Sequence, residues 1–298
     1  MGDAMDALDP GYERTYDLVE RPFSLTPDEK YHFRSAAHRR AQDAVAAAQR
    51  RNERFVLITG DLGAGKTTLC RTLVGQLLRQ GPAAFVPNPL LRPEDLLRLL
   101  LQDFEAVSPE EVRRGRLAGA SRHELGDELH HFLLGLQTAR HAVVIIDEAQ
   151  LMPSAIVEQV VQLSGIEHSG RPLMHFVLAS QSTGYLQSLT EQRLDPHLAS
   201  RARLTPLERD ECGAYIAHRL TIAGGAPDLF TPRAVDAIYD LSGGLPRLVN
   251  LLCERALQVA GASGARRVEP AAIESAASAL DLLRARPKRF RWFGSRVS

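Results

Sequence analysis

Gly60-Asp61-Leu62-Gly63-Ala64-Gly65-Lys66-Thr67 is the stretch of this sequence that decides its fold. It matches the pattern Gly-x-x-x-x-Gly-Lys-Ser/Thr, a glycine-rich loop whose backbone N–H groups cradle phosphates at the start of a helix. Lys66 is one of only three lysines in the chain, against thirty-three arginines. A compact ammonium on a slim stem fits between phosphates in a tight loop, where a planar guanidinium does not. The stretch therefore predicts a phosphate-binding loop.

The residues on either side of the loop have the pattern that a P-loop requires. Residues 55–59 form a short apolar run that ends in Thr59, typical of a strand buried on both faces, and residues 67–80 continue as a helix. Strand, loop and helix in this order favour a P-loop over a glycine-rich turn without a ligand. We expect the hydroxyl of Thr67 to bind Mg²⁺. The residues expected to bind the nucleotide are Gly60, Asp61, Leu62, Gly63, Ala64, Gly65, Lys66, Thr67 and Thr68.

A second apolar run, residues 142–146, ends in the adjacent acids Asp147 and Glu148. Two carboxylates at the end of a buried strand are unfavourable unless a cation or a reaction uses them. We expect Asp147 to be the Mg²⁺ ligand and Glu148 the base that polarises the attacking water. The alternative, a surface turn after a core strand, is disfavoured beside a P-loop. The second acid indicates hydrolysis of ATP rather than nucleotide sensing alone.

Strands and helices alternate through the first two thirds of the chain. Further strands are expected at 83–87 and 174–178, and helices at 35–51, 93–104, 121–138 and 153–165. This alternation predicts an α/β fold in which helices cover both faces of a parallel sheet. After Pro206 the pattern gives only helices, at 208–223, 232–241, 246–260 and 270–284. We therefore expect a second, all-helical lid subdomain.

The domain boundaries follow from these changes of pattern. Residues 1–20 are polar and turn-prone, so we expect them to be flexible. The divisions expected are 1–50 for an N-terminal segment and helix, 51–206 for the nucleotide-binding α/β domain, 207–284 for the helical lid and 285–298 for a basic and aromatic tail.

Composition narrows the class of protein. The net charge is zero, so no overall positive field favours nucleic acid. Three cysteines without metal-ligand spacing, Cys70, Cys212 and Cys253, predict buried free thiols in a reducing compartment. Residues 1–10 hold three Asp and no apolar stretch, so we expect no signal peptide. No apolar run approaches the roughly 18 residues of a membrane span. We expect a cytoplasmic protein.

Five segments together resemble a known family. They are residues 22–28 (Pro-Phe-Ser-Leu-Thr-Pro-Asp), 60–68, 146–150 (Ile-Asp-Glu-Ala-Gln), 207–219 and 243–250 (Gly-Gly-Leu-Pro-Arg-Leu-Val-Asn). With them the chain resembles an AAA+ ATPase of the ExeA, or general secretion pathway protein A, type, and more distantly the transposition-regulator ATPases. The resemblance covers roughly residues 20–284. It implies a P-loop NTPase domain with a helical lid, and hydrolysis of ATP with Mg²⁺ to ADP and phosphate.

The resemblance also implies roles for three residues. Arg247 corresponds to the sensor-2 arginine, which reaches from the lid to the γ-phosphate. A cation near a helix start is unfavourable for the helix dipole, which favours a functional role for Arg247. Arg201 corresponds to the arginine finger that completes the site of a neighbouring subunit, with Arg193 and Arg203 as rivals. Gln181 corresponds to the sensor-1 amide that orients the water, with Ser180 as the alternative.

A site shared between subunits implies a ring or helical homo-oligomer. The family resemblance implies remodelling of a protein partner, of the secretion, pilus or envelope-assembly kind. In this family a membrane span and a peptidoglycan-binding domain can follow the ATPase region. The present sequence ends before either, and we expect an ATPase module that needs a partner. The alternatives are an ATP-dependent DNA-binding regulator and a scaffold that senses nucleotide without hydrolysis.

Two further segments have open interpretations. The tail, residues 286–293, interleaves basic and aromatic side chains, which suits peripheral contact with the inner face of a membrane or stacking on nucleic acid. A solubilising tail is the alternative. Phe23 is expected near the adenine, at a subunit boundary or in the core.

Overall fold

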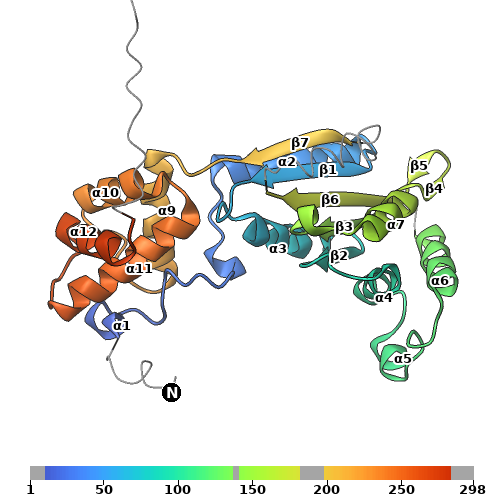
Figure 1. The fold of residues 1–298 in the computed structure, drawn as a ribbon, viewed down its shortest axis with the longest axis horizontal. Helices are drawn as coiled ribbons and strands as arrows, with labels where there is room; N and C mark the ends of the chain where they lie inside the picture. Colours follow the sequence, from blue (N-terminus) through green and yellow to red (C-terminus); the bar gives the residue numbers. More distant parts are fainter. Residues whose placement is uncertain (1–10, 137–140, 182–197, 283–298) are drawn as a thin grey trace, which may run out of the picture. The chain divides into compact units, whose positions relative to one another are not determined.

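The computed structural model describes residues 11–136, 141–181 and 198–282. Within them, five strands form one parallel sheet in the order β2-β3-β6-β1-β7 (Figure 1). The strands are β1 (Phe55–Gly60), β2 (Ala83–Val86), β3 (Ala142–Ile146), β6 (Met174–Ser180) and β7 (Leu198–Leu204). Two short strands, β4 (Glu167–His168) and β5 (Arg171–Pro172), form a separate antiparallel hairpin. The sequence predicts every strand of the large sheet except β7.

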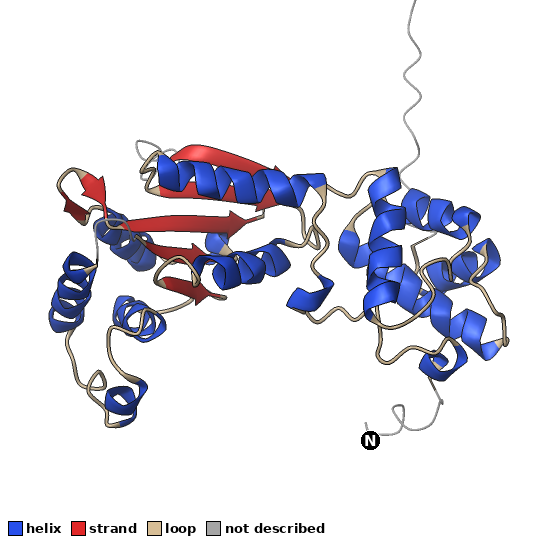
Figure 2. Ribbon diagram, turned by 180° about the vertical axis from the view of Figure 1, so that it is seen from behind, coloured by secondary structure: helices blue, strands red, loops and turns tan. Residues whose placement is uncertain are grey.

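Helices cover both faces of this sheet (Figure 2). The helices of this part of the chain are η1 (Glu29–Tyr31), α2 (Ala36–Arg50), α3 (Lys66–Leu77), α4 (Pro93–Asp103), α5 (Pro109–Arg113), α6 (Arg122–Gly135), η2 (Ala149–Leu151) and α7 (Ser154–Ser164). Apolar residues of α4, α6 and α7 form one core with alternate residues of the strands, such as Leu57 and Phe176. Helices α2 and α3 contact β1 but contribute nothing to that core, so they cover the other face. The predicted α/β sandwich is confirmed.

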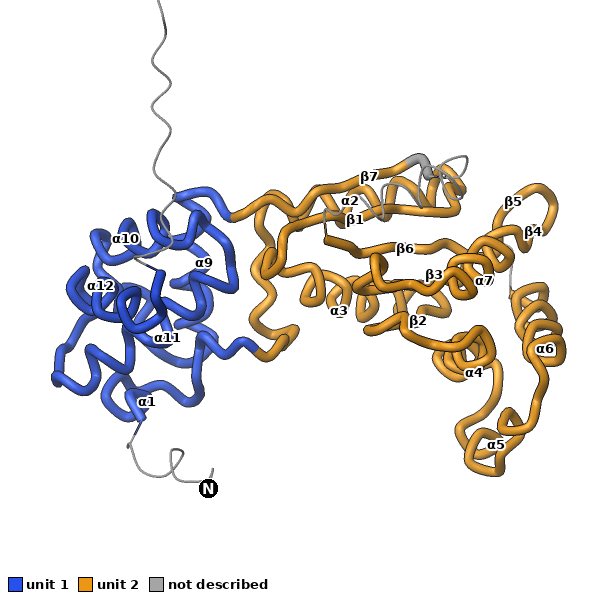
Figure 3. The backbone as a smooth tube through the Cα atoms, viewed as in Figure 1, with its two compact units in different colours: residues 1–25, 207–298 blue, residues 26–206 orange. Residues whose placement is uncertain are grey.

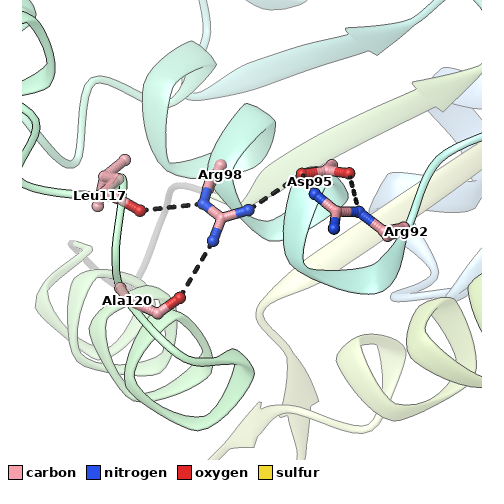
Figure 4. A network of polar contacts seen from close by, with 5 residues as sticks. All are labelled: Arg92, Asp95, Arg98, Leu117 and Ala120. Atoms are coloured by element: carbon pink, nitrogen blue, oxygen red, sulfur yellow. Dashed lines mark hydrogen bonds and ion pairs between the residues drawn. The ribbon is translucent and has the colours of Figure 1, made fainter.

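The chain between β2 and β3 makes an excursion through α4, α5 and α6. The guanidinium of Arg98 on α4 donates to the carbonyl oxygens of Leu117 (3.0 Å) and Ala120 (3.1 Å) and pairs with Asp95 (3.0 Å; Figure 4). These bonds fasten the loop before α6 to α4. Within the excursion, Ser108 and Ser121 cap α5 and α6 by accepting from backbone N–H groups that have no partner inside the helix.

Strand β7 was missed because two arginines interrupt its apolar pattern. Residues Arg201 and Arg203 lie exposed on this edge strand, in register with Leu57 and Thr59 of β1. Ser200 and Leu204 on either side of them are buried, and Ala202 between them is half-buried. Alternation of exposed and buried residues is the pattern of a half-buried edge strand. A search for continuous apolar runs does not detect it.

The described residues divide into two compact units, shown in blue and orange in Figure 3. One unit holds residues 26–206, with the sheet, and the other holds residues 1–25 together with 207–298. The helices of the second unit are α1 (Tyr12–Thr15), α9 (Arg209–Ile222), α10 (Pro232–Ser242), α11 (Pro246–Ala262) and α12 (Pro270–Ala279). The all-helical region after residue 206 is therefore as expected. The N-terminal division differs from the expected 1–50, because α2 belongs to the sheet unit.

Residues 11–25 pack against the lid helices, which corrects the expected flexibility of residues 1–20 for the part from residue 11 onward. Tyr12 is buried and its hydroxyl donates to Glu254 of α11 (2.6 Å). Phe23, 1% exposed, stands edge-to-face against Phe230 at 5.9 Å between ring centroids. Of the alternatives for Phe23, packing in the core is what the structure shows. Residues 1–10 and the tail 283–298 lie outside the described residues.

All three cysteines, Cys70, Cys212 and Cys253, are free and buried, as predicted. Among the described residues, no helix is both long and apolar enough to cross a bilayer.

Candidate functional site

The glycine-rich loop joins the carboxyl end of β1 to the first turn of α3. Gly65 is the N-cap residue of α3 and has φ = +94°, a left-handed conformation that residues with a Cβ rarely adopt. A Cβ at this position would also meet Nε2 of His38 at 3.2 Å. The glycine therefore lets the loop turn sharply under α2 while the first turn of α3 points its N–H groups into the loop. A helix start of this kind binds anions.

Lys66 lies folded over its own loop. Its Nζ donates to the carbonyl oxygens of Gly60 (3.0 Å) and Asp61 (3.1 Å), and the residue is 5% exposed. Burial lowers the pKa of Lys66, and the negative charges of Glu148 and Asp147 oppose that change. The ammonium thus lies at the mouth of the loop with two acids within electrostatic reach.

Thr67 and Asp147 face each other across the same edge of the sheet. The Thr67 hydroxyl donates to Oδ2 of Asp147 at 2.6 Å, and Oδ1 of Asp147 accepts from the backbone N–H of Glu148 at 2.9 Å. Asp147 is 2% exposed. Burial raises its pKa, and these two hydrogen bonds oppose the rise.

The oxygens of Thr67 and Asp147 fit a magnesium ion chemically, because hydroxyl and carboxylate oxygens are hard ligands. In the part of the chain that the structure describes, no three His, Cys, Asp or Glu side chains are grouped in a way that could hold a metal. A magnesium ion at this edge would therefore need phosphate and water oxygens to complete its octahedral shell, the usual arrangement for Mg²⁺ with nucleotides.

Glu148 is held by two glutamine amides. It has φ = +48°, an uncommon left-handed conformation for a residue with a side chain. Its Oε2 accepts from Nε2 of Gln150 and, at 3.5 Å, from Nε2 of Gln181. Oε1 of Gln150 in turn accepts from the backbone N–H of Gln181 at 3.2 Å. Gln181, predicted as the sensor-1 residue, thus reaches Glu148.

The structure therefore gathers Lys66, Thr67, Asp147, Glu148 and Gln181 at one edge, where β1, β3 and β6 end. Parallel strands bring their carboxyl ends together, which explains why residues far apart in sequence meet here. Sequence reasoning gave Gln150 no role beyond membership of a family pattern. Its signal is spatial, since its partners lie about thirty residues further along the chain.

The arginine predictions stay predictions. Arg201 and Arg203 are both exposed on β7 and point to the same side, so the strand does not choose between them. Arg193 lies outside the described residues. Arg247 is exposed near the start of α11 and belongs to the lid unit.

Comparisons with known proteins match the part of the chain that holds this edge. Residues 49–187 match the AAA domain family. General secretion pathway protein A of Aeromonas hydrophila is 34% identical over 261 residues, which are 86% of this chain and 46% of that protein. The chain thus spans about half the length of this curated relative.

Solved structures with the same fold include three whose sequences are distant. Cdc6p of Pyrobaculum aerophilum has a TM-score of 0.67 at 15% identity, over 91% of this chain and 75% of its own. The Aeropyrum pernix ORC1 protein, solved in complex with DNA, has a TM-score of 0.63 at 18% identity, over 90% of this chain and 73% of its own. Thermotoga maritima RuvB, a Holliday junction branch migration motor, has a TM-score of 0.55 at 17% identity, over 82% of this chain and 68% of its own. At such identities the likeness shows the fold alone. We therefore identify the chain as an AAA-domain protein with the AAA+ fold, similar to general secretion pathway protein A.

Proposed function

We propose that this protein binds ATP with Mg²⁺ at the carboxyl edge of its sheet and hydrolyses it to ADP and phosphate. The observation that carries the proposal is the bonded pair Thr67–Asp147 beside the glutamine-held Glu148, directly next to the glycine-rich loop. Nucleotide hydrolysis needs two side chains that can bind a metal ion and a general base, all next to a phosphate-binding loop.

Binding would begin with the loop. The N–H groups of the first turn of α3 meet the polyphosphate, and Lys66 exchanges the carbonyl oxygens of Gly60 and Asp61 for phosphate oxygens. An anionic acceptor is stronger than a neutral carbonyl, so the exchange favours the bound state. The hydroxyl of Thr67 and the carboxylate of Asp147 would hold Mg²⁺, which, when bound, neutralises charge on the phosphates.

Hydrolysis would then use Glu148 as general base. A water oxygen attacks the γ-phosphorus, the bond from that phosphorus to the β,γ-bridging oxygen breaks, and ADP leaves with the bonding electrons. The proton of the water passes to the Glu148 carboxylate. The amide of Gln181, already within reach of Glu148, would help to orient the water. Each of these groups at the edge thus has one part in the proposed reaction.

We propose further that the active form is a ring or helical homo-oligomer acting on a protein partner. The support is the similarity to general secretion pathway protein A and the exposure of Arg201 and Arg203 on an edge strand, where a neighbouring subunit can use them. An arginine supplied in trans contributes about 10³-fold or more to phosphoryl transfer. Arg247 would act from the lid of the same chain.

The test is steady-state hydrolysis of Mg-ATP, measured together with nucleotide binding. We expect turnover in the wild type, loss of turnover with retained binding in Glu148→Gln, and weakened binding in Lys66→Ala. A wild-type chain that binds no ATP would end the proposal. Binding without hydrolysis would favour the scaffold that only senses nucleotide.

The oligomer is tested by measuring turnover per chain at increasing protein concentration. A steep rise supports a site shared between subunits, and a rate per chain that stays constant contradicts it. Retention of DNA at low salt that requires ATP would favour the DNA-binding regulator instead of a protein-remodelling ATPase.

A further inference from the structure

We propose that Gln150 is a positioning residue for this hydrolysis. Its amide fixes the carboxylate of Glu148 and ties it to the end of β6. The inference rests on the proposed function, because it concerns the base of that same site.

Both the nitrogen and the oxygen of the Gln150 amide form hydrogen bonds. On one side Nε2 donates to Oε2 of Glu148. On the other side Oε1 lies 3.2 Å from the backbone nitrogen of Gln181 and 3.0 Å from the hydroxyl oxygen of Ser180. One short side chain thus joins the segment after β3 to the segment that ends β6.

The direction of the amide follows from chemistry. The backbone N–H of Gln181 can only donate, so the oxygen of the Gln150 amide must face it and the NH₂ group must face Glu148. The Ser180 hydroxyl is less decisive. Its single hydrogen has two acceptors in reach, Oε1 of Gln150 and the carbonyl oxygen of Gln181 at 2.8 Å. The backbone donor alone therefore sets the orientation.

The local backbone helps to bring the two side chains together. Glu148 adopts its left-handed conformation immediately before the short helix η2, whose residue Leu151 donates back to the Glu148 carbonyl at 2.8 Å. Ala149 between them is fully buried and Ser180 opposite is 0% exposed. A strained residue in such surroundings persists because its neighbours hold it, and strain of this kind gathers at active sites.

Neither leucine nor glutamate at position 150 could make the same link. A leucine has no polar group, and a glutamate would place a second negative charge against Glu148 and lose the donor. The bonds from Gln150 and Gln181 both go to Oε2 of Glu148, so Oε1 is the oxygen that would meet the attacking water. When one carboxylate oxygen is held, the position of the other is fixed as well. Misplacing a catalytic group by about 1 Å can lower the rate by about 10²-fold.

The experiment compares Gln150→Leu, Gln150→Glu and Gln150→Asn with the wild type in Mg-ATP hydrolysis, ATP binding and thermal unfolding. We expect Gln150→Leu and Gln150→Glu to lower kcat by about 10- to 100-fold, while the dissociation constant for Mg-ATP changes less than about threefold. Gln150→Asn keeps the amide on a shorter stem and should recover part of the rate. The control is Gln159→Leu, which removes a more deeply buried glutamine whose amide oxygen accepts from Arg122, away from the site. It should leave kcat unchanged.

The outcomes separate this inference from the proposed function. Wild-type kcat in a folded Gln150→Leu variant overturns the positioning role and leaves ATP hydrolysis intact. Equal loss of binding, thermal stability and turnover in all three Gln150 variants also overturns it, because a purely structural residue behaves in that way. A wild-type chain without turnover overturns the proposed function itself.

Discussion

The carboxyl edge of the sheet and the interior of the lid both bury polar side chains, yet they differ in kind. In the lid, Arg219 donates to the carbonyl oxygen of Pro22 and to the hydroxyl of Tyr215 (2.8 Å), and Tyr215 donates to Asn250 (2.8 Å). These bonds join the N-terminal segment to α9 and α11.

At the sheet edge, by contrast, the buried ammonium of Lys66 and the carboxylates of Asp147 and Glu148 lie beside the glycine-rich loop and the start of α3. Burial of polar groups therefore does not by itself identify a site. A structural network links neutral and cationic donors to protein acceptors, whereas the edge concentrates charges that the fold alone does not require. Substitutions at the edge should therefore change turnover, and those in the interior of the lid should change stability.

The largest effect is expected for Asp147→Asn. Loss of the metal-binding charge should lower Mg-ATP turnover at least about 100-fold, equivalent to about 3 kcal/mol in the barrier. The free energy of unfolding should not fall, because a neutral amide is less costly to bury than a carboxylate. Hydrolysis assays and urea denaturation measure the two quantities. Asp103→Asn is the control, because Asp103 is another carboxylate that accepts a backbone N–H, from Phe85. Turnover that survives Asp147→Asn would break the comparison.

Gly244→Ala should be the most destabilising change in the lid. Gly244 has φ = +74°, and a Cβ there would lie 2.0 Å from the carbonyl oxygen of Leu207. Overpacking costs about 1–3 kcal/mol, and the left-handed conformation adds about 1 kcal/mol.

Gly243→Ala is a matched control, since Gly243 has φ = +60° and its Cβ would meet nothing within 4 Å. Circular dichroism during urea denaturation should show the larger loss for Gly244→Ala. Equal losses in the two variants would mean that close packing at Gly244 is not the reason for the glycine pair.

Arg219→Met should loosen the N-terminal segment. The change removes the donor to Pro22 while keeping an aliphatic stem, and we expect a loss of about 1–3 kcal/mol. Limited proteolysis within residues 11–25 should become faster. Arg209→Met is the control on the same helix, because the exposed pairs of Arg209 with Asp236 and Asp240 contribute little. Proteolysis equally fast in both variants would contradict the anchoring role of Arg219.

The smallest effect concerns the amino ends of the strands, where His175 of β6 is 3% exposed and contacts the carbonyl oxygen of Glu53. Burial lowers the pKa of His175 below its ordinary value, and the bond to Glu53 opposes this. The unfolded chain therefore takes up a proton near pH 6.5 that the folded chain does not. Stability should fall as the pH drops below about 6.5, by at most about 1.4 kcal/mol per pH unit.

Urea midpoints at pH 7.5 and 5.5, compared between the wild type and His175→Gln, measure this contribution. The variant should lose less stability on acidification. An identical pH dependence in the two proteins would remove His175 as its source.

Local patterns predict the centre of this molecule well. The buried strand β3 is a continuous apolar run, β1 is apolar up to Thr59, and β6 is interrupted by His175. The loop after β1 and the acids after β3 belong to short motifs with a direct chemical meaning. Because the strands are parallel, their carboxyl ends lie side by side, and the residues that follow them meet at one site. The placement of Lys66, Thr67, Asp147 and Glu148 follows from that rule.

What sequence reasoning missed depends on distant partners. The hydroxyl of Tyr12 bonds to Glu254, 242 residues away, so nothing near Tyr12 signals that the segment is ordered. Strand β7 is not predicted because Arg201 and Arg203 interrupt its apolar residues. Their alternation can be recognised as a strand only once β7 is seen to pair with β1. Gln150 likewise gains its role from Ser180 and Gln181.

The most direct test of the account is the identity of the nucleotide that stays bound after incubation with Mg-ATP. Wild-type protein and Glu148→Gln would be incubated, desalted rapidly and denatured, and the released nucleotide separated by chromatography. We predict ADP from the wild type and ATP from Glu148→Gln, because the variant keeps Lys66, Thr67 and Asp147 but lacks the base. ATP released from both proteins, or no nucleotide from either, would contradict the assignment of the carboxyl edge as a hydrolytic site.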